Sequence, residues 1–331
     1  MNRIPFRQRF ILILLQNTSV ILFAGVLLVF GSLSGRFLAL NNLMNILIQS
    51  SSMAIVATGM TFVLLTGGID LSVGSVMFLS AVIAGKIVLN GYGLLPAFAA
   101  ILAVGIICGT INALFVTGLR MMPFIVTLAM LFVARGLGLW ISQTRAMNLP
   151  ENLLQVGSAK IAAIPFPVLI FMVVLIAAHV VLTRTPLGRQ IYAVGNDPVA
   201  SHKAGIDGTR ILFSVYLISG FCAALGGLVS VAQLGAVSPK FGEQREFAAI
   251  AAAVLGGTSL FGGRGTVFPG AVLGAILIQT VENGLVIVKA DPYIYPLITS
   301  GIIFLAVFID SVRHRRIYAL RRRRIRMEKT D

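Results

Sequence analysis

Two apolar runs of the chain are separated by the stretch Thr66-Gly67-Gly68-Ile69-Asp70-Leu71-Ser72-Val73-Gly74. The runs, residues 46–66 and 73–89, are close to the roughly 20 residues that a helix needs to cross a bilayer. A Gly pair followed by a carboxylate and a hydroxyl side chain is suited to ending the first helix and beginning the second. The stretch therefore predicts two membrane helices joined by an interruption near 67–74.

The rest of the chain has the same apolar character. Of its 331 residues, 57% are hydrophobic and 11% are charged, whereas about 25% are charged in a soluble domain. This composition, with a mean hydropathy of +0.96, excludes a soluble enzyme and a disordered protein. We predict an all-α polytopic membrane protein. About ten transmembrane helices are expected at residues 11–33, 46–66, 73–89, 95–117, 123–142, 166–183, 211–235, 247–261, 266–288 and 294–310.

The basic residues predict the orientation of these helices. With ten spans, 18 Lys and Arg residues fall on the side of the two termini, seven fall on the other side, and Arg135 lies within a span. The positive-inside rule then places both termini in the cytoplasm. Residues 1–310 are expected to form one transmembrane domain, and residues 311–331 a basic tail that lies on anionic membrane lipid. Nucleic-acid binding by the tail is the alternative, and we do not favour it.

A second glycine cluster echoes the first one. It reads Gly256-Gly257-Thr258-Ser259-Leu260-Phe261-Gly262-Gly263-Arg264-Gly265. Transporters use such paired interruptions where unwound backbone lines a pathway; the alternative is that both clusters are short cytoplasmic turns. Glycines four residues apart elsewhere, at 105 and 109 and at 270 and 274, are expected to let helices pack closely.

Two loops are longer than simple turns. The inner one, residues 184–210, carries apolar residues at helical spacing and is a candidate protein-docking element. Within this loop, Pro198 suits the first turn of a short helix. Asn196 or Asp197 can be the N-cap of that helix, and Gly205 can end it. The outer loop, residues 143–165, either folds over the external mouth of a pathway or is a passive connector.

The chain lacks the motifs of several enzyme classes. It has no G-x-x-x-x-G-K-[ST] phosphate loop, and its three histidines form no zinc-binding motif. No arrangement of Ser, His and Asp typical of nucleophilic catalysis is found. Cys108 and Cys222 lie in apolar runs, where a thiol behaves as a small hydrophobic group. We expect no metal site and no cofactor bound by this chain.

Ionisable residues inside predicted spans are functional candidates, because charge is costly in lipid. They are Asp70, Arg135, Glu246 and Glu282. Asp70 is expected either to cap the following helix or to act in a pathway. For Arg135 and Glu282 we expect an ion pair across the bundle interior or contact with a hydrated cavity.

Three stretches resemble one known family: Gly59-Met-Thr-Phe-Val-Leu-Leu-Thr-Gly-Gly-Ile-Asp-Leu-Ser-Val-Gly74, Gly188-Arg-Gln-Ile-Tyr-Ala-Val-Gly-Asn196, and Ala248-Ala-Ile-Ala-Ala-Ala-Val-Leu-Gly-Gly-Thr-Ser-Leu-Phe-Gly-Gly-Arg-Gly-Thr266. They are similar to the permease subunits of ribose-type ABC importers, which carry monosaccharides and, in some members, autoinducer-2. The resemblance covers about residues 45 to 310 and implies a multi-pass protein of the bacterial inner membrane.

The resemblance also implies partners. These are an identical or paralogous second permease, an extracytoplasmic solute-binding protein, and ABC ATPase subunits that hold ATP and Mg²⁺. The inner loop is then the ATPase-coupling element, and the matching residues are Gly188, Asn196, Ala200, Gly205 and Ile206. Two positions depart from the family pattern: Ser201 stands where a second alanine is usual, and Ala248 where an acidic residue is common.

We therefore predict a permease for a small sugar-like solute. Polar and aromatic side chains suited to weak contacts with such a solute are Thr66, Asp70, Ser72, Thr258, Ser259, Phe261 and Asn283. Each of them could instead form a hydrogen bond between helices. The alternative function is a secondary carrier that uses Asp70 or Glu282 for proton or cation coupling.

Overall fold

The computed structural model describes residues 18–305, 307–308 and 311–312. Its α-helices are α2 (Thr18–Leu33), α3 (Leu40–Leu65), α4 (Val73–Leu89), α5 (Leu94–Thr117), α6 (Pro123–Ser142), α7 (Glu151–Ser158), α8 (Phe166–Arg184), α9 (Pro186–Asn196), α10 (Pro198–Lys203), α11 (Gly208–Leu234), α12 (Arg245–Leu255) and α13 (Val272–Ile287). A π-helical turn, Val267–Ala271, precedes α13, and a 3₁₀ turn, Pro292–Ile294, leads into a last helix that reaches Leu305. The strands are β1 (Met147–Asn148), β2 (Lys160–Ile161), β3 (Ile164–Pro165) and β4 (Ala236–Val237).

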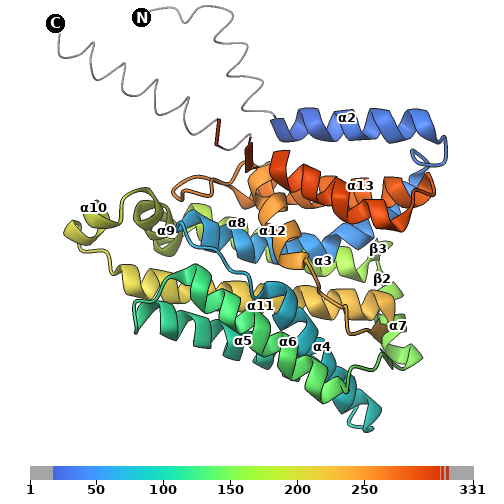
Figure 1. Cartoon of the computed structure of the whole chain (residues 1–331), viewed down its shortest axis with the longest axis horizontal. Helices are drawn as coiled ribbons and strands as arrows, with labels where there is room; N and C mark the ends of the chain where they lie inside the picture. Colours follow the sequence, from blue (N-terminus) through green and yellow to red (C-terminus); the bar gives the residue numbers. More distant parts are fainter. Residues whose placement is uncertain (1–17, 306, 309–310, 313–331) are drawn as a thin grey trace, which may run out of the picture.

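The long helices lie side by side in one bundle (Figure 1). The α9/α10 end of the bundle carries these two short helices, and the opposite α7 end carries α7, β2 and β3 (Figure 1). Helix α11 is central and packs against α3, α4 and α5. A side chain at Gly105 of α5 would overlap the Gly220 carbonyl of α11, and Gly109 also lies against Gly220. The expected close packing at these glycines is confirmed.

The all-α membrane architecture is confirmed at the level of helix length. Among the described residues, six helices are long and apolar enough to cross a membrane: α3, α5, α6, α8, α11 and the segment Val267–Ile287. Three shorter apolar helices are Val20–Leu33, Val73–Leu89 and Pro292–Leu305. The beginning of the first predicted span, part of the end of the last one, and nearly all of the basic tail lie outside the described residues.

The predicted span at 247–261 is wrong. Helix α12 ends at Leu255 after 11 residues, and at 1.5 Å per residue it is about half as long as a bilayer core is thick. Gly257 has a backbone φ of +95°, which stops the helix. No helix follows until Val267, and Phe268 is itself extended.

The expected interruption near 67–74 is confirmed, because the chain is not helical between Thr66 and Ser72. Helices α4 and α12 both begin part-way along the bundle rather than at its end (Figure 1). The two entering segments touch each other. A side chain at Gly74 would overlap the Gly242 carbonyl, and one at Gly242 would overlap the Gly74 carbonyl. Two broken segments therefore cross inside the bundle.

The loop 143–165 is folded. Its strand β1 pairs antiparallel with β4, with Met147 opposite Val237, and β2 pairs with β3. Helix α7 packs on α11, where Gly157 lies against the Ala232 carbonyl. The loop thus forms an ordered layer attached to the connection between α11 and α12.

Candidate functional site

Three glycine-rich segments that are far apart in the sequence meet at the α9/α10 end of the bundle. The Gly263 N–H donates a hydrogen bond of 2.8 Å to the Leu65 carbonyl at the end of α3. Gly262 lies beside the Gly195 carbonyl of α9 and the Gly67 nitrogen. A side chain at Gly195 would overlap the Leu65 carbonyl. The two glycine clusters and the inner loop therefore form one assembly around α9.

Helix α9 is fixed to this assembly through its own side chains. The Tyr192 hydroxyl donates a 2.7 Å hydrogen bond to the Gly265 carbonyl. Burial raises the pKa of Tyr192, so the phenol keeps the proton that it donates. Ile191 is buried, and Gly188 lies against the Leu182 carbonyl of α8. Gly188 is therefore a packing position and not a surface one.

Helix α10, in contrast, projects from the assembly. Asp197 caps it by accepting hydrogen bonds from the Val199 and Ala200 N–H groups at 3.0 and 2.9 Å, which confirms the predicted N-cap. Val199 is 66% exposed. Four of the five predicted coupling residues lie in this exposed or half-exposed segment: Asn196, Ala200, Gly205 and Ile206.

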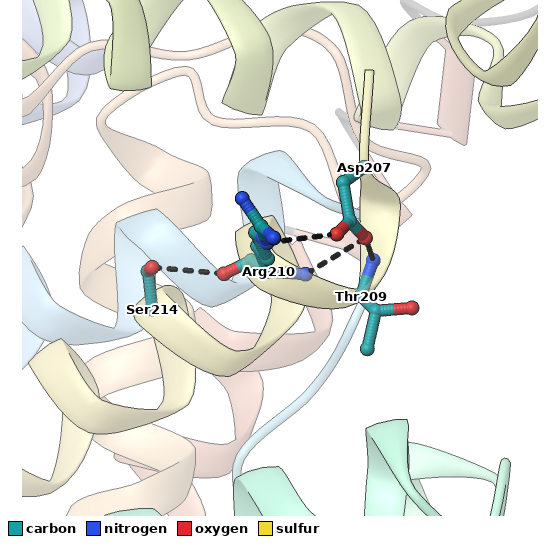
Figure 2. A network of polar contacts seen from close by, with 4 residues as sticks. All are labelled: Asp207, Thr209, Arg210 and Ser214. Atoms are coloured by element: carbon teal, nitrogen blue, oxygen red, sulfur yellow. Dashed lines mark hydrogen bonds and ion pairs between the residues drawn. The ribbon is translucent and has the colours of Figure 1, made fainter. Parts of the chain in front are cut away.

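The chain after α10 is fixed in the same way. Asp207 accepts hydrogen bonds from the Thr209 and Arg210 N–H groups at 3.0 and 3.3 Å, and its carboxylate lies 3.0 Å from the Arg210 Nε atom. The Ser214 hydroxyl donates to the Arg210 carbonyl at 2.8 Å, as Figure 2 shows. The ion pair is exposed and contributes little to stability. The caps at Asp197 and Asp207 define where the two helices begin.

The pathway candidates of the second glycine cluster form a tight turn. The Ser259 N–H donates to the Arg264 carbonyl at 2.9 Å, and the Ser259 hydroxyl accepts from the Phe261 N–H at 3.2 Å. Thr258 is buried, whereas Phe261 is 57% exposed. Thr66 is half-buried and donates to the carbonyl three residues earlier in α3. The hydroxyls of Ser259 and Thr66 thus have partners within the chain.

Asp70 and Ser72 belong to a buried polar network. Asp70 is 1% exposed, and it accepts hydrogen bonds from the Ser72 N–H at 2.9 Å and the Ser72 hydroxyl at 2.6 Å. The Ser219 hydroxyl of α11 donates to its other oxygen at 2.7 Å. The Asn112 amide of α5 donates to the Ser72 hydroxyl at 2.9 Å. The N-cap of α4 is Ser72 and has no side-chain cap hydrogen bond, so Asp70 does not cap the helix directly. Its network instead joins the start of α4 to two neighbouring helices.

The expected ion pair between Arg135 and Glu282 is wrong. Arg135 of α6 donates a 2.7 Å hydrogen bond to the Phe241 carbonyl, and its guanidinium lies 4.6 Å from the centroid of the Phe78 ring. Glu282 of α13 instead lies 3.9 Å from Arg245 of α12. Segment 238–244 enters the bundle beside α6, and the carbonyl groups of Pro239 and Phe241 accept hydrogen bonds from Arg135.

The remaining candidates lie near α12 and α13. Glu246 is 6% exposed, and its Oε2 atom faces Gly74 and has no hydrogen-bond partner among the described residues. Asn283 accepts a 2.9 Å hydrogen bond from the Asn42 amide of α3. No group of three His, Cys, Asp or Glu residues able to hold a metal ion is found in the described part of the chain.

Comparison with known proteins identifies the family. A family model described as the permease component of the branched-chain amino acid transport system matches residues 42–309. The chain belongs to this permease family.

Curated relatives of the permease cover most of its length. The ribose import permease protein RbsC of Escherichia coli (strain K12) is 38% identical over 303 residues, which are 90% of this chain and 94% of RbsC. The D-allose transport system permease protein AlsC of the same strain is 37% identical over 292 residues, 87% of this chain and 89% of AlsC. The autoinducer 2 import system permease protein LsrC of Enterobacter sp. (strain 638) is 34% identical over 307 residues, 91% of this chain and 89% of LsrC. No solved structure matches the permease.

These relatives confirm the resemblance to permease subunits of ribose-type ABC importers. The permease is accordingly a transport component and a multi-pass protein of the bacterial inner membrane, and six helices in its described part are long and apolar enough to cross that membrane.

Sequence reasoning missed two contacts that organise the permease. Gly195 was not among the candidate residues, although it allows α9 to reach the Leu65 carbonyl. The contact of Arg135 with the Phe241 carbonyl was missed because a backbone acceptor leaves no signature in the side-chain sequence. The position of Gly195 beside Asn196 in a family-like stretch was the one available signal for the first contact.

Proposed function

We propose that the chain forms the translocation pathway of an ATP-driven importer for a small sugar-like solute. The names of its relatives include ribose, D-allose and fructose import or transport permeases, at 37–38% identity. Family membership together with one structural observation carries the proposal. The exposed helix α10 follows α9, which contacts the end of α3 and the second glycine cluster, beside the points where the membrane helices are interrupted.

The proposed topology has ten membrane segments with both termini in the cytoplasm, and one of them is the broken segment 238–255, in which only α12 is helical. Short α12 then enters the bundle without crossing it alone, and the α9/α10 end is cytoplasmic. The excess of basic residues on that side supports this orientation. Residues 1–310 form the transmembrane domain, and the basic tail 311–331 meets anionic lipid rather than nucleic acid.

The loop 184–210 docks the ATPase partner in this proposal. The proposed contacts are Asn196, Ala200, Gly205 and Ile206, which is supported by their exposed or half-exposed positions. Gly188 acts indirectly, because it lets α9 pack against α8. The partner holds ATP and Mg²⁺. Because α9 contacts α3 and the second glycine cluster, closure of the ATPase subunits moves these two elements through α9. Two alternating arrangements of the bundle then move the solute.

The remaining partners are a second permease copy or paralogue and an extracytoplasmic solute-binding protein that delivers the solute. At the cytoplasmic exit, Thr66 and exposed Phe261 are the pathway candidates closest to the surface. Asp70, Ser72, Thr258 and Ser259 act from the buried interior by shaping the two interruptions. Asn283 belongs to the opposite half of the bundle.

The test is reconstitution with the cognate ATPase and binding protein. In proteoliposomes, the binding protein loaded with D-ribose is expected to stimulate ATP hydrolysis and drive uptake. Val199→Asp places a charge on the exposed face of α10 and is expected to abolish the stimulation. Asn152→Asp, on exposed α7 at the opposite end, is the matched control and should retain it.

Uptake that continues without an ATPase and follows a proton gradient would contradict the proposal. It would favour the secondary carrier and direct attention to Asp70 and Glu282. Unchanged stimulation in Val199→Asp would instead reject α10 as the docking element.

A further inference from the structure

Helix α3 carries exposed amide side chains on an otherwise apolar membrane helix. Asn45 and Gln49 are exposed and are four residues apart, so they share one face of the helix. The residues from Ser50 to Leu65, in contrast, are all buried. The exposed amides therefore lie in the half of α3 away from the α9/α10 end.

The polar surface continues onto α13. The side chain of Gln279 is buried, at 8% exposure, and supports this surface by donating a 3.0 Å hydrogen bond to the Gln49 side-chain oxygen. One turn further along α13, the Asn283 side chain accepts from Asn42, which is next to the exposed Asn41. Two side-chain pairs thus join α3 and α13 along this stretch.

A charged pair extends the same surface onto α12. Arg245 and Glu282 lie 3.9 Å apart, with side chains 39% and 31% exposed. Glu282 is adjacent to Asn283 and three residues from Gln279, which places it on the same side of α13. We name the set Asn45, Gln49, Arg245, Gln279, Glu282 and Asn283 the α3–α13 polar face.

This face is unsuited to lipid. Acyl chains cannot satisfy amide or ionised groups, and a charged residue at the centre of a bilayer costs at least about 2.5 kcal/mol. The outward side chains of α5 and α6 show what a lipid-facing surface looks like, since Ile107 and Phe132 are exposed and apolar. The exposed part of the polar face is therefore suited to water or a polar ligand rather than to acyl chains.

We infer that the α3–α13 polar face lines the solute passage in the half of the membrane opposite the ATPase. This inference rests on the proposed function. Amides both donate and accept hydrogen bonds, and Arg245 and Glu282 together carry no net charge. The surface therefore suits a neutral polyhydroxylated solute, whose adjacent hydroxyls can bind a paired donor and acceptor. Contacts of this kind are weak enough for the solute to leave.

Labelling of introduced cysteines tests whether water reaches the α3–α13 polar face, and it does not require transport. Gln49→Cys and Asn45→Cys are made in the full chain, in which Cys108 and Cys222 are buried. A hydrophilic maleimide is expected to label both variants in the assembled importer at least tenfold faster than it labels Ile107→Cys, the lipid-facing control. Equal, slow labelling of all three would overturn the inference, as would a disulfide between two copies at position 49 without maleimide labelling.

Transport then tests solute contact. Gln49→Leu is expected to reduce D-ribose uptake at least tenfold, whereas Gln49→Asn, which keeps an amide, should restore part of it. The binding-protein-stimulated ATP hydrolysis of Gln49→Leu and the temperature of its unfolding in detergent show whether the complex is intact. Normal uptake by an intact Gln49→Leu would overturn the inference.

The two proposals can fail separately. If the wild-type complex shows no ATP-driven uptake of D-ribose but the labelling contrast is observed, the proposed function fails for that solute. The inference that water reaches the α3–α13 polar face is then still supported. If uptake is normal but labelling is absent, the passage lies elsewhere in the bundle.

Discussion

Arg135 shows how one side chain fixes a segment that has no helix of its own. Its guanidinium bonds to the Phe241 carbonyl and lies over the Phe78 ring. Arg135→Met removes both contacts, and hydrogen bonds to charged groups contribute about 1.5–3 kcal/mol. We expect the free energy of unfolding to fall by about 2 kcal/mol, measured by denaturation in detergent. Arg145→Met, at an exposed loop position, is the control, and equal losses in both variants would contradict this role.

Substitutions at Asp70 distinguish a structural role of this carboxylate from a role in ion coupling. An asparagine at this position can still accept from the Ser72 N–H, and its amide can donate to the Ser219 hydroxyl after that hydroxyl rotates. Asp70→Asn is therefore expected to keep ATP-driven uptake within about threefold, while Asp70→Ala leaves buried donors unsatisfied and destabilises the protein by about 1–3 kcal/mol. Abolished uptake in a stably folded Asp70→Asn would favour the secondary carrier.

At the scale of helices, α9 packs closely against the end of α3. The added methyl group of Gly195→Ala would overlap the Leu65 carbonyl and the Gly263 nitrogen, which must move to admit it. We expect loss of most binding-protein-stimulated ATP hydrolysis in proteoliposomes, because α9 can no longer seat against both segments. Gly208→Ala, where no atom lies within 4 Å of the new Cβ, should behave as wild type. Coupling that survives in Gly195→Ala would show that this seat is not needed.

At the same scale, the segment 247–261 shows that hydropathy alone does not always predict a membrane span correctly. Residues 247–261 have the hydropathy of a span, but α12 ends at Leu255. An apolar composition shows that a segment avoids water, but it does not distinguish contact with lipid from contact with other helices. Most of α12 is buried by α3, α4 and α13 rather than by lipid. The interruption at 67–74 was predictable because paired glycines end a helix locally.

At the scale of the whole molecule, the two ends of the bundle should lie on opposite sides of the membrane. Lys203 of α10 and Asn152 of α7 are both exposed. In intact spheroplasts, a membrane-impermeant maleimide should label Asn152→Cys, and it should label Lys203→Cys only after permeabilisation. The wild-type chain, with its two buried cysteines, gives the background. The reverse pattern would invert the proposed topology.

The sequence by itself determined the membrane class, most helix positions, the first interruption, the capped helix α10 and the family. These features depend on local composition or on short motifs, which act over a few residues. Only the tertiary structure decided which polar groups meet: Arg135 with a backbone carbonyl, Glu282 with Arg245, and Gln49 with Gln279. In a bundle whose helices are nearly all apolar, hydropathy does not fix which helices become neighbours. Close approach at glycines such as Gly105 and Gly195 does, because it depends on shapes that residues distant in the sequence create together.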